Sequence, residues 1–380
     1  MASVRKWMEH SGVLAMETDR LTLKIGHLPT LYHTSFTLMG TSILKDHGVD
    51  AEWTLFPSGP DLVNAMRYGH IDLGYVGLPP AIIGIDTGVQ LICIAGAHVE
   101  GTVLIAREDV TPVDRCADMV EFLQQFSGAA IGCPPRGSIH DVIVNELLKE
   151  HHIKDVRVKN YAWADFLPDA LAEGDIAAAA GTPALAVVAR RYYKAQMVVP
   201  PVQLWPCNPS CGIVVMRQDL TDRTDVLRKF LSAHEKACEM IRENPRKCAR
   251  VVARTTGIVD ESFMADLYQI SPKYCAALSA EYVSSTMKLV NALNTLGYIA
   301  RRVSETEIFD VSLIKEVHTA QPHYQCQRSA KLRKMSTQKR PGHSSAAKRD
   351  HQAASCAQCV WGLQKRNSRT NRSTISERDK

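Results

Sequence analysis

The 380-residue chain has no long apolar run. Its longest uncharged apolar stretch, residues 176–189, is interrupted by Gly181, Thr182 and Pro183, whereas a membrane-spanning helix needs roughly 20 apolar residues. Residues 1–20 hold one short apolar patch, 11–16, where a secretory signal needs an apolar core of roughly 7 to 15 residues. We therefore expect no membrane insertion and a cytoplasmic protein, or a periplasmic or other extracytoplasmic one if the start of the chain is misassigned.

Motifs of several enzyme classes are also missing. The sequence has no Walker loop, no nucleophile elbow and no acidic metal-binding motif. We expect no catalytic residue, no resident cofactor and no metal site. The first 320 residues hold cysteines mostly singly in apolar segments, which is typical of reduced, buried thiols: Cys93, Cys116, Cys133, Cys207, Cys211, Cys238, Cys248 and Cys275.

Two close cysteine pairs leave alternatives open. Cys207 and Cys211, in the sequence CNPSC, could hold a metal, act as a redox pair, form a disulfide, or be two thiols in a tight turn. Cys356 and Cys359 lie near His351 but lack a second cysteine pair, so the pattern supports a zinc knuckle only weakly.

Little of the positive charge lies in the body of the chain. The sequence has 45 Lys and Arg against 40 Asp and Glu; residues 321–380 hold 14 against 3, which leaves 31 against 37 for residues 1–320. A basic surface for nucleic acid is therefore not expected. Residues 321–380 are rich in Ser, Gln, Lys and Arg without apolar periodicity, which predicts a disordered basic tail.

From residue 21 onward, short β-rich runs alternate with helical segments, the order typical of a parallel sheet flanked by helices. The order restarts near residue 129, and GHI before a strand ending in GLPPA is echoed by GDI before one ending in GTPA. This pattern predicts an α/β protein with two lobes of like topology, each a mainly parallel sheet flanked by helices. Gly-x-Pro turns after buried strands are common, so the echo could also be chance.

The segment after residue 216 has helical periodicity to about 317 and adds no sheet. We place these helices on the first lobe, so that the chain crosses between lobes near 104–110 and 209–216. The predicted organisation is an N-terminal extension at 1–20, a first lobe at 21–106 plus 213–320, a second lobe at 107–212, and the tail at 321–380.

Loops after the predicted strands converge on one cleft, because ligands of open parallel sheets bind beyond the carboxyl ends of the strands. Several loops begin helices, whose free N–H groups favour anions, so a small solute with an anionic group is the predicted ligand. Arg136 would pair with a sulfonate or carboxylate, or be a surface arginine on the rim. His27 and His33 could contact the anion or be solvated loop histidines. Thr182 starts the matching helix of the second lobe, and Ser138 is also suited to cap a helix.

Residues 21 to about 318 resemble the sulfonate, nitrate and taurine family of type II solute-binding proteins, in the superfamily of thiamine-pyrimidine synthase-like proteins. The resemblance is carried by LKIGHLPT, FPSGPDLVNAMRYGHIDLGYVGLPPAI and CPPRGSIHDVIVNELL. It implies a two-lobed Venus-flytrap fold that delivers a sulfonate, nitrate, bicarbonate or carboxylate to an ABC permease and ATPase; we expect a monomer. The family's binding positions carry over to His27, Pro29, His33, Ser58, Gly59, Gly77, Leu78, Gly137 and Ser138.

The alternative is an enzyme of similar fold. A cytosolic relative that makes the thiamine pyrimidine sacrifices a His and holds pyridoxal phosphate on a Lys just after the third strand. The matching positions here are Val76 and Pro80, so that chemistry lacks both its amine and its imidazole. A menaquinone-pathway dehydratase stays open as an alternative, because dehydration could proceed with few titrating residues.

Overall fold

The computed structural model describes residues 22–271 and 273–324. All of them belong to one unit of the chain, residues 1–328. The predicted extension at 1–20, most of the predicted tail, and the Cys356 and Cys359 pair lie outside the described residues. No helix of the described part is both long and apolar enough to cross a membrane.

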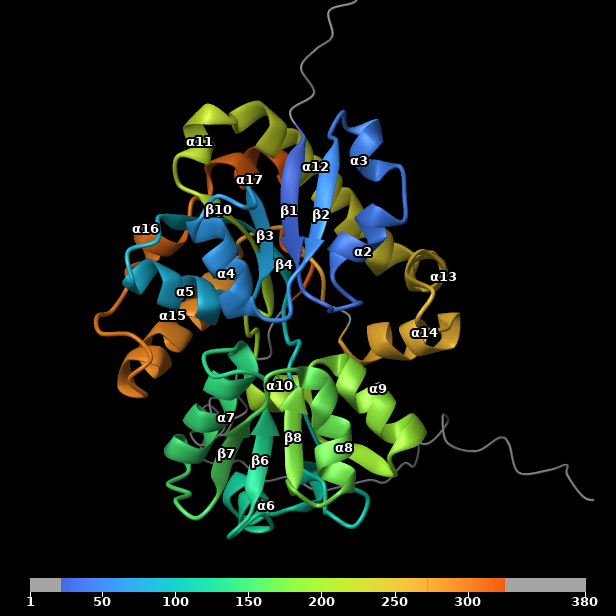
Figure 1. The fold of residues 1–380 in the computed structure, drawn as a ribbon, viewed down its shortest axis with the longest axis vertical. Coiled ribbons are helices and arrows are strands. Elements are labelled where there is room, and N and C mark those ends of the chain that lie inside the picture. The colour runs from blue at the N-terminus through green and yellow to red at the C-terminus, as the bar shows by residue number, and fades with distance from the viewer. Residues whose placement is uncertain (1–21, 272, 325–380) are drawn as a thin grey trace, which may run out of the picture. The chain divides into compact units, whose positions relative to one another are not determined.

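The first lobe is built on a five-stranded sheet, drawn mainly in blue in Figure 1. Its strands are β1 (Leu23–His27), β2 (Ala51–Leu55), β3 (Leu73–Val76), β4 (Leu91–His98) and β10 (Cys211–Met216), in the order β2-β1-β3-β10-β4. β1 pairs in parallel with β2 and β3, and β10 pairs antiparallel with β3 and β4. Four strands thus share one direction, and β10 alone is reversed.

The second lobe repeats this arrangement. Its strands are β5 (Val103–Arg107), β6 (Ala130–Cys133), β7 (Arg157–Asn160), β8 (Ala178–Gly181) and β9 (Ala195–Val199), in the order β7-β6-β8-β5-β9. β5 is the reversed strand. In each lobe the reversed strand is the one that the chain forms after crossing from the other lobe, so the prediction of two α/β lobes of like topology is confirmed.

Helices flank both sheets (Figure 1). In the first lobe they are α2 (Thr34–Met39), α3 (Ile43–Asp46), α4 (Gly59–Arg67) and α5 (Leu78–Asp86). In the second they are η1 (Val113–Arg115), α6 (Met119–Gln124), α7 (Ile139–Glu150), η2 (Ala164–Phe166), α8 (Leu167–Ala172), α9 (Pro183–Tyr192) and α10 (Pro201–Leu204).

The chain ends in a helical region: α11 (Asp219–Asp222), α12 (Thr224–Glu243), α13 (Pro245–Thr256), α14 (Glu261–Ile270), α15 (Ala280–Thr295), α16 (Glu305–Ile308) and α17 (Ser312–Val317). As predicted, α12 and α13 pack on the first lobe, against α2. α14 also contacts α9, and α15 contacts both α5 and α7. These two helices therefore touch both lobes, which was not predicted.

The crossings lie earlier than predicted. β4 ends at His98 and β5 begins at Val103 in the other sheet, so the first crossing is 99–102 and not 104–110. The second crossing precedes Cys211, where β10 begins. The strands on either side of the first crossing are both apolar and buried, so no change of composition marks the boundary.

The open edge of β4 is covered by segments from much later in the chain. Ala276 O accepts the amide of Gly96, and Ala97 O accepts the amide of Cys275. Tyr324, in the segment predicted as tail, is 8% exposed and belongs to the hydrophobic core. Residues 321–324 are therefore part of the folded body, because an aromatic side chain there buries its apolar surface.

Seven of the eight body cysteines are free thiols, as predicted. Cys211 is one of them, so it does not form a disulfide with Cys207. Cys207 itself is disulfide-bonded, which corrects the expectation of a reduced thiol at that position.

Candidate functional site

A cavity of about 360 Å³ opens between loops of the two lobes. Its wall is formed by residues from segments 28–33, 57–59 and 77–80 of the first lobe and 134–140, 164–168 and 181–193 of the second. Gly101 and Ser210, one near each crossing, complete the lining. Prolines and aliphatic side chains contribute much of the wall, so the cavity suits a small organic molecule with an apolar part.

Helices α4, α7 and α9 are among those that begin at this cavity. Their N-cap residues Ser58, Ser138 and Thr182 all line it. The hydroxyls of Ser58 and Ser138 each accept an amide hydrogen from the residue three positions later, at N···O distances of 3.4 and 3.3 Å. These two caps satisfy the third amide of α4 and α7 and leave the earlier amides for a ligand.

The earlier amides that face no acceptor belong to Gly59 in α4, Ile139 and His140 in α7, and Ala184 in α9. All four residues line the cavity, and among the described residues none of these N–H groups has a partner. The positive ends of three helix dipoles add to these donors. The cavity therefore offers backbone hydrogen-bond donors from both lobes to a negatively charged group.

α5 starts at the same cavity but offers fewer donors. Pro79 and Pro80 have no N–H, and the amide of Leu78 donates to Pro209 O at 3.4 Å. Gly77, the N-cap of α5, lies close to the second crossing: a Cβ at this position would come within 3.3 Å of Ser210 O. Gly77 thus lets the backbones of two segments approach each other beside the cavity.

Two imidazoles, of His33 and His140, line the cavity. Burial lowers the pKa of His140 to about 4, and its Nδ1 lies 3.0 Å from Thr102 Oγ1. Burial, reinforced by nearby His98, lowers the pKa of His33 well below its ordinary value. Both rings are therefore neutral at pH 7, so they can exchange hydrogen bonds with a ligand but supply no positive charge.

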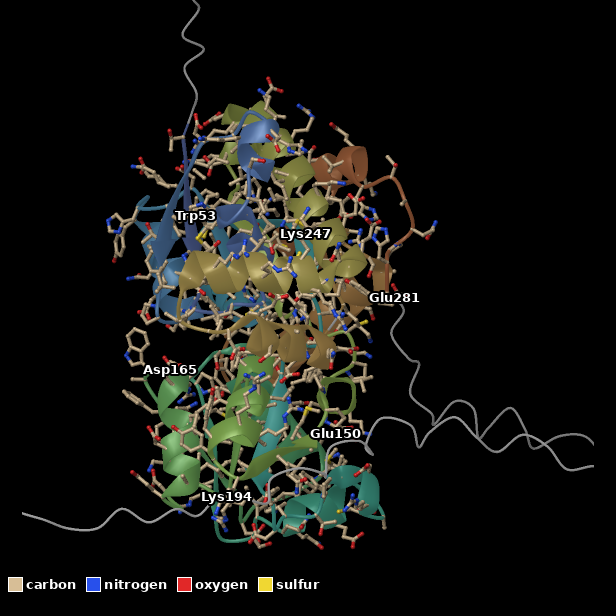
Figure 2. All side chains as sticks on the ribbon, turned by 90° about the vertical axis from the view of Figure 1, so that its right-hand side faces the viewer. Trp53, Glu150, Asp165, Lys194, Lys247 and Glu281 are labelled. Carbon is tan, nitrogen blue, oxygen red and sulfur yellow. The ribbon has the colours of Figure 1, made fainter. Side chains whose placement is uncertain are left out.

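The wall contains one carboxylate and, among the described residues, no lysine or arginine. The carboxylate is that of Asp165 in η2, which is exposed and lies at the end of the second lobe that faces the first (Figure 2). Tyr32 and Tyr193 contribute phenol groups; the Tyr193 hydroxyl donates to Asp169 Oδ1 at 2.8 Å. Among the described residues of the wall, backbone dipoles at the helix starts are therefore the source of positive potential.

Most of the predicted binding residues do meet at this cavity. Those that line it are Pro29, His33, Ser58, Gly59, Gly77, Ser138 and Thr182. Those that do not are His27, Leu78, Arg136 and Gly137. The predicted loops therefore meet at one cavity, whereas these four residues lie outside its wall.

His27 and Leu78 face the interior of the first lobe. The His27 ring donates from Nδ1 to Leu28 O at 3.1 Å and packs edge-on against Phe36 and Trp53. Burial lowers the pKa of His27, so the ring is neutral in this apolar setting. Leu78 is fully buried in the core.

Arg136 and Gly137 shape the loop before α7 without lining the cavity. The Arg136 guanidinium is exposed and lies 5.2 Å from the ring centre of Tyr298, beside a separate hollow of about 280 Å³ that Arg67 also lines. Gly137 has a φ of +83°, and its amide donates to Asp141 Oδ2 at 2.8 Å. Tyr298 donates to the same oxygen at 2.7 Å, so one buried carboxylate fixes this loop.

Several residues of the wall were not among the predicted binding residues: Tyr32, His140, Asp165, Leu185, Tyr193 and Ser210. His140 lies at the second position of α7, where the helix period could have indicated that it shares the cavity with Ser138. Tyr193 comes directly after the end of α9, and Ser210 lies in the second crossing, directly before β10. No local sequence pattern indicates that either residue lines a cavity.

The chain belongs to the NMT1-like family, which it matches over residues 17–257. Proteins of Brucella abortus and Brucella suis described as binding proteins are 31% identical over 61 residues, 16% of this chain and 19% of those proteins. The alignment thus spans about a fifth of the length of these curated relatives.

Solved structures share the fold. The ligand-binding component of an ABC-type import system from Staphylococcus aureus, with zinc bound, is 18% identical with a TM-score of 0.66, over 79% of this chain and 99% of that one. The nitrate-binding protein NrtA of Synechocystis PCC 6803 is 12% identical with a TM-score of 0.64, over 78% of this chain and 88% of that one. The alkanesulfonate-binding protein SsuA of Xanthomonas axonopodis pv. citri, bound to MOPS, is 15% identical with a TM-score of 0.62, over 76% of this chain and 98% of that one. The fold is therefore the two-lobed α/β fold of periplasmic binding proteins.

Proposed function

We propose that this protein is a solute-binding protein that captures a small organic molecule carrying an anionic group and presents it to an ABC importer. The fold supports this proposal, because the structural neighbours named above are the ligand-binding component of an ABC-type import system, a nitrate-binding protein and an alkanesulfonate-binding protein. The two lobes are joined by two crossings and hold the cavity between their loops. Closure of such lobes on a solute is the change that an importer would read.

The observation that carries the anionic assignment is the convergence of α4, α7 and α9 on one cavity. Among the described residues, the amides of Gly59, His140 and Ala184 have no hydrogen-bond partner, and they lie at the starts of these helices. The uncharged imidazoles of His33 and His140 can add hydrogen bonds to the ligand without supplying positive charge. An oxyanion held in this way is bound by backbone dipoles rather than by a guanidinium or ammonium group.

The size of the cavity favours an organic anion over a small inorganic one. A volume of about 360 Å³ is many times the roughly 10–15 Å³ that a single water molecule needs on the same measure, whereas nitrate and bicarbonate have only four heavy atoms each. The aliphatic and proline wall would leave apolar surface uncovered around either ion. We therefore favour a sulfonate or carboxylate with an apolar body.

Asp165 supports a second candidate class. It is the only acidic side chain of the wall in the described part of the chain, and a carboxylate at the rim would attract an amine or amidine. A zwitterion could satisfy both Asp165 and the helix starts. An amino-substituted heterocycle with no anionic group would use Asp165 and the tyrosines instead.

A same-fold enzyme is the rival to simple binding. No described lysine lines the cavity, so a Schiff base with pyridoxal phosphate has no amine there. Imidazoles are present, at His33 and His140, although not at the positions that correspond to the thiamine-pyrimidine enzyme. Their low pKa values make both poor proton donors at neutral pH.

The test is a thermal-shift and calorimetric panel on the purified full chain. Each ligand is paired with an uncharged analogue of the same skeleton: alkanesulfonate with sulfone, carboxylate with amide. Nitrate, bicarbonate, an aminopyrimidine and a chorismate derivative complete the panel, and product analysis accompanies each. A rise in Tm specific to the charged member supports the proposal. Binding of the aminopyrimidine alone contradicts the anionic assignment, and turnover of any member contradicts a binding-only role.

A further inference from the structure

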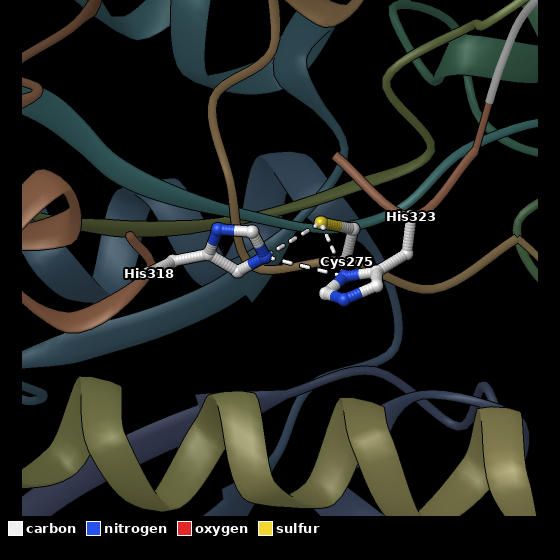
Figure 3. Close-up of side chains that lie close together, drawn as sticks. All are labelled: Cys275, His318 and His323. Atoms are coloured by element: carbon white, nitrogen blue, oxygen red, sulfur yellow. Dashed lines mark hydrogen bonds between the residues drawn. The ribbon is translucent and has the colours of Figure 1, made fainter. Parts of the chain in front are cut away.

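Cys275, His318 and His323 bring one potential metal-ligand atom each to a single point outside the cavity (Figure 3). Cys275 Sγ lies 3.3 Å from His318 Nε2 and 3.4 Å from His323 Nδ1, and the two ring nitrogens are 3.2 Å apart. Ligand atoms at about 2.0–2.1 Å (N) and 2.3 Å (S) from a tetrahedral zinc are separated by roughly 3.3–3.6 Å. The three atoms are thus already spaced as three corners of such a site.

We propose that Cys275, His318 and His323 form a binding site for a late first-row transition metal, with zinc as the expected ion. One thiolate and two imidazoles suit zinc and copper and offer no oxygen ligand for magnesium or calcium. None of the three residues lines the ligand cavity. This proposal departs from the expectation, drawn from the absence of a sequence motif, that the chain holds no metal.

The three ligands come from segments that only the fold brings together. Cys275 lies between α14 and α15, beside the covered edge of β4, where its amide donates to Ala97 O. His318 follows α17, and His323 lies five residues further on. A metal here would tie the segment that contains Tyr324 to the edge of the first sheet.

The burial of the three residues suits a bound ion that remains accessible. Cys275 is fully buried and His318 is 9% exposed, whereas His323 is exposed and gives a route from solvent. The second ring nitrogen of His323 points away from the cluster in Figure 3. Removal of His323 should therefore disturb the fold less than removal of Cys275.

Glu235 on α12 stands beside the fourth position. Its Oε1 lies 3.9 Å from both His318 Nε2 and His323 Nδ1. This oxygen is also 2.9 Å from Arg242 Nη2, and the other oxygen accepts the amide of Ala276 at 3.0 Å. The carboxylate is held by these contacts, so we assign the fourth position to water and place Glu235 as its hydrogen-bond acceptor.

One feature lowers the expected affinity. His318 Nδ1 is buried and has no hydrogen-bond partner among the described residues. A metal on Nε2 places the proton on Nδ1, where the usual carbonyl or carboxylate acceptor is missing. Such partners contribute roughly 10- to 100-fold in metal affinity, so we expect weaker binding than at a fully supported zinc site.

The experiment uses the full chain, stripped with EDTA and dialysed, under anaerobic conditions. Cobalt is titrated first, because a cysteine ligand gives a sulfur-to-cobalt absorption band and tetrahedral geometry gives intense visible bands; zinc is then added to displace it. The expected result is one cobalt per chain with both signatures, and displacement by one zinc. No sulfur-to-cobalt band at saturating cobalt overturns the proposal.

Matched variants assign the ligands. H323Q is expected to weaken zinc binding by at least roughly 10- to 100-fold without a change in the far-UV spectrum, and C275S to abolish the sulfur-to-cobalt band. Two controls, C116S at another free thiol and a C356S/C359S double variant, should leave stoichiometry and affinity unchanged. Unchanged binding in both H323Q and C275S, or loss of the band in C356S/C359S, overturns the proposal. Because neither variant touches the cavity, solute binding is read out separately.

Discussion

The carboxylate of Glu100, near the first crossing, accepts the backbone amide hydrogen of Cys207, near the second, with Oε1 3.1 Å from that nitrogen. The Glu100 amide donates in return to Asn208 O at 3.0 Å, and Lys273 Nζ lies 2.8 Å from the carboxylate. Glu100 is 5% exposed and has a φ of +62°. One buried carboxylate thus links both connections between the lobes to the segment that leads to Cys275.

Replacing Glu100 by alanine is expected to lower the free energy of unfolding by about 3 kcal/mol, the lower end of the range for breaking a buried ion pair. The lower end applies because the Lys273 side chain is 23% exposed and can be partly hydrated. Urea denaturation at pH 7 measures the change. Glu100→Gln keeps an oxygen for the Cys207 amide and should cost less; an equal loss in both variants would show that this amide contact contributes little.

Stability should fall in mild acid because of His140. Its pKa is about 4 in the folded chain and about 6.5 when unfolded, so between these values the unfolded state binds more protons. This contribution to the free energy of unfolding is present in full above about pH 6.5 and declines as the pH falls. At pH 4 about 3 kcal/mol of it has been lost, and the loss is complete below that pH. Its location in the first turn of α7 also disfavours a positive charge.

His140→Gln should therefore remove about 2 kcal/mol of the stability difference between pH 7.5 and pH 5. Urea denaturation at both pH values measures it. The exposed His70 provides the matched control, and His70→Gln should keep the wild-type difference. If the His140 variant loses as much stability between pH 7.5 and pH 5 as wild type, the loss is caused by other buried histidines.

Ala184→Pro tests the backbone donors directly. It deletes one N–H in the first turn of α9, where proline fits a helix, and α5 already begins with two consecutive prolines. For an anionic solute we expect a loss of about 1.5–3 kcal/mol, the range for a hydrogen bond to a charged group. Calorimetric titration measures affinity. Ala184→Ser retains the N–H and should bind like wild type; equal affinity in the proline variant would remove this amide from the site.

Arg136 and Ser138 should differ in their effects although they are two residues apart. Arg136→Ala should leave solute affinity unchanged, because Arg136 lies outside the cavity, and should cost about 0.5–1 kcal/mol through the lost contact with Tyr298. Ser138→Ala should lower stability by about 1 kcal/mol through the lost cap. Thermal melts and titrations of both variants decide; a large affinity loss in Arg136→Ala would bring that guanidinium back into the site.

Tyr324→Ala should destabilise the body by about 3–5 kcal/mol, the cost of truncating a buried aromatic side chain. The exposed Tyr68 offers a comparison at the same residue type, since it is 66% exposed. Tyr68→Ala should change stability by no more than about 0.5 kcal/mol. A similarly small effect of Tyr324→Ala would mean that the body ends before this residue.

The sequence was sufficient for the architecture because local rules and burial agree along most of the chain. Apolar runs that end at Gly and Pro marked most strands of both sheets, and Ser138 caps α7 as its position indicated. The loops that form the cavity were predictable for the same reason: in this topology they follow the carboxyl ends of strands. The sequence could not locate the first crossing, because β4 and β5 are both apolar and differ only in the sheet they join.

Tertiary packing determined which neighbours each side chain contacts. Arg136 and Ser138 belong to the same loop. The Arg136 guanidinium nevertheless contacts the ring of Tyr298, from a distant part of the chain, whereas Ser138 lines the cavity. Cys275 meets His318 and His323 across separations of 43 and 48 residues, which no spacing motif records. Local sequence determines where the backbone turns, since that depends on neighbouring residues; which side chains then meet depends on contacts that exist only once the sheets and helices have packed.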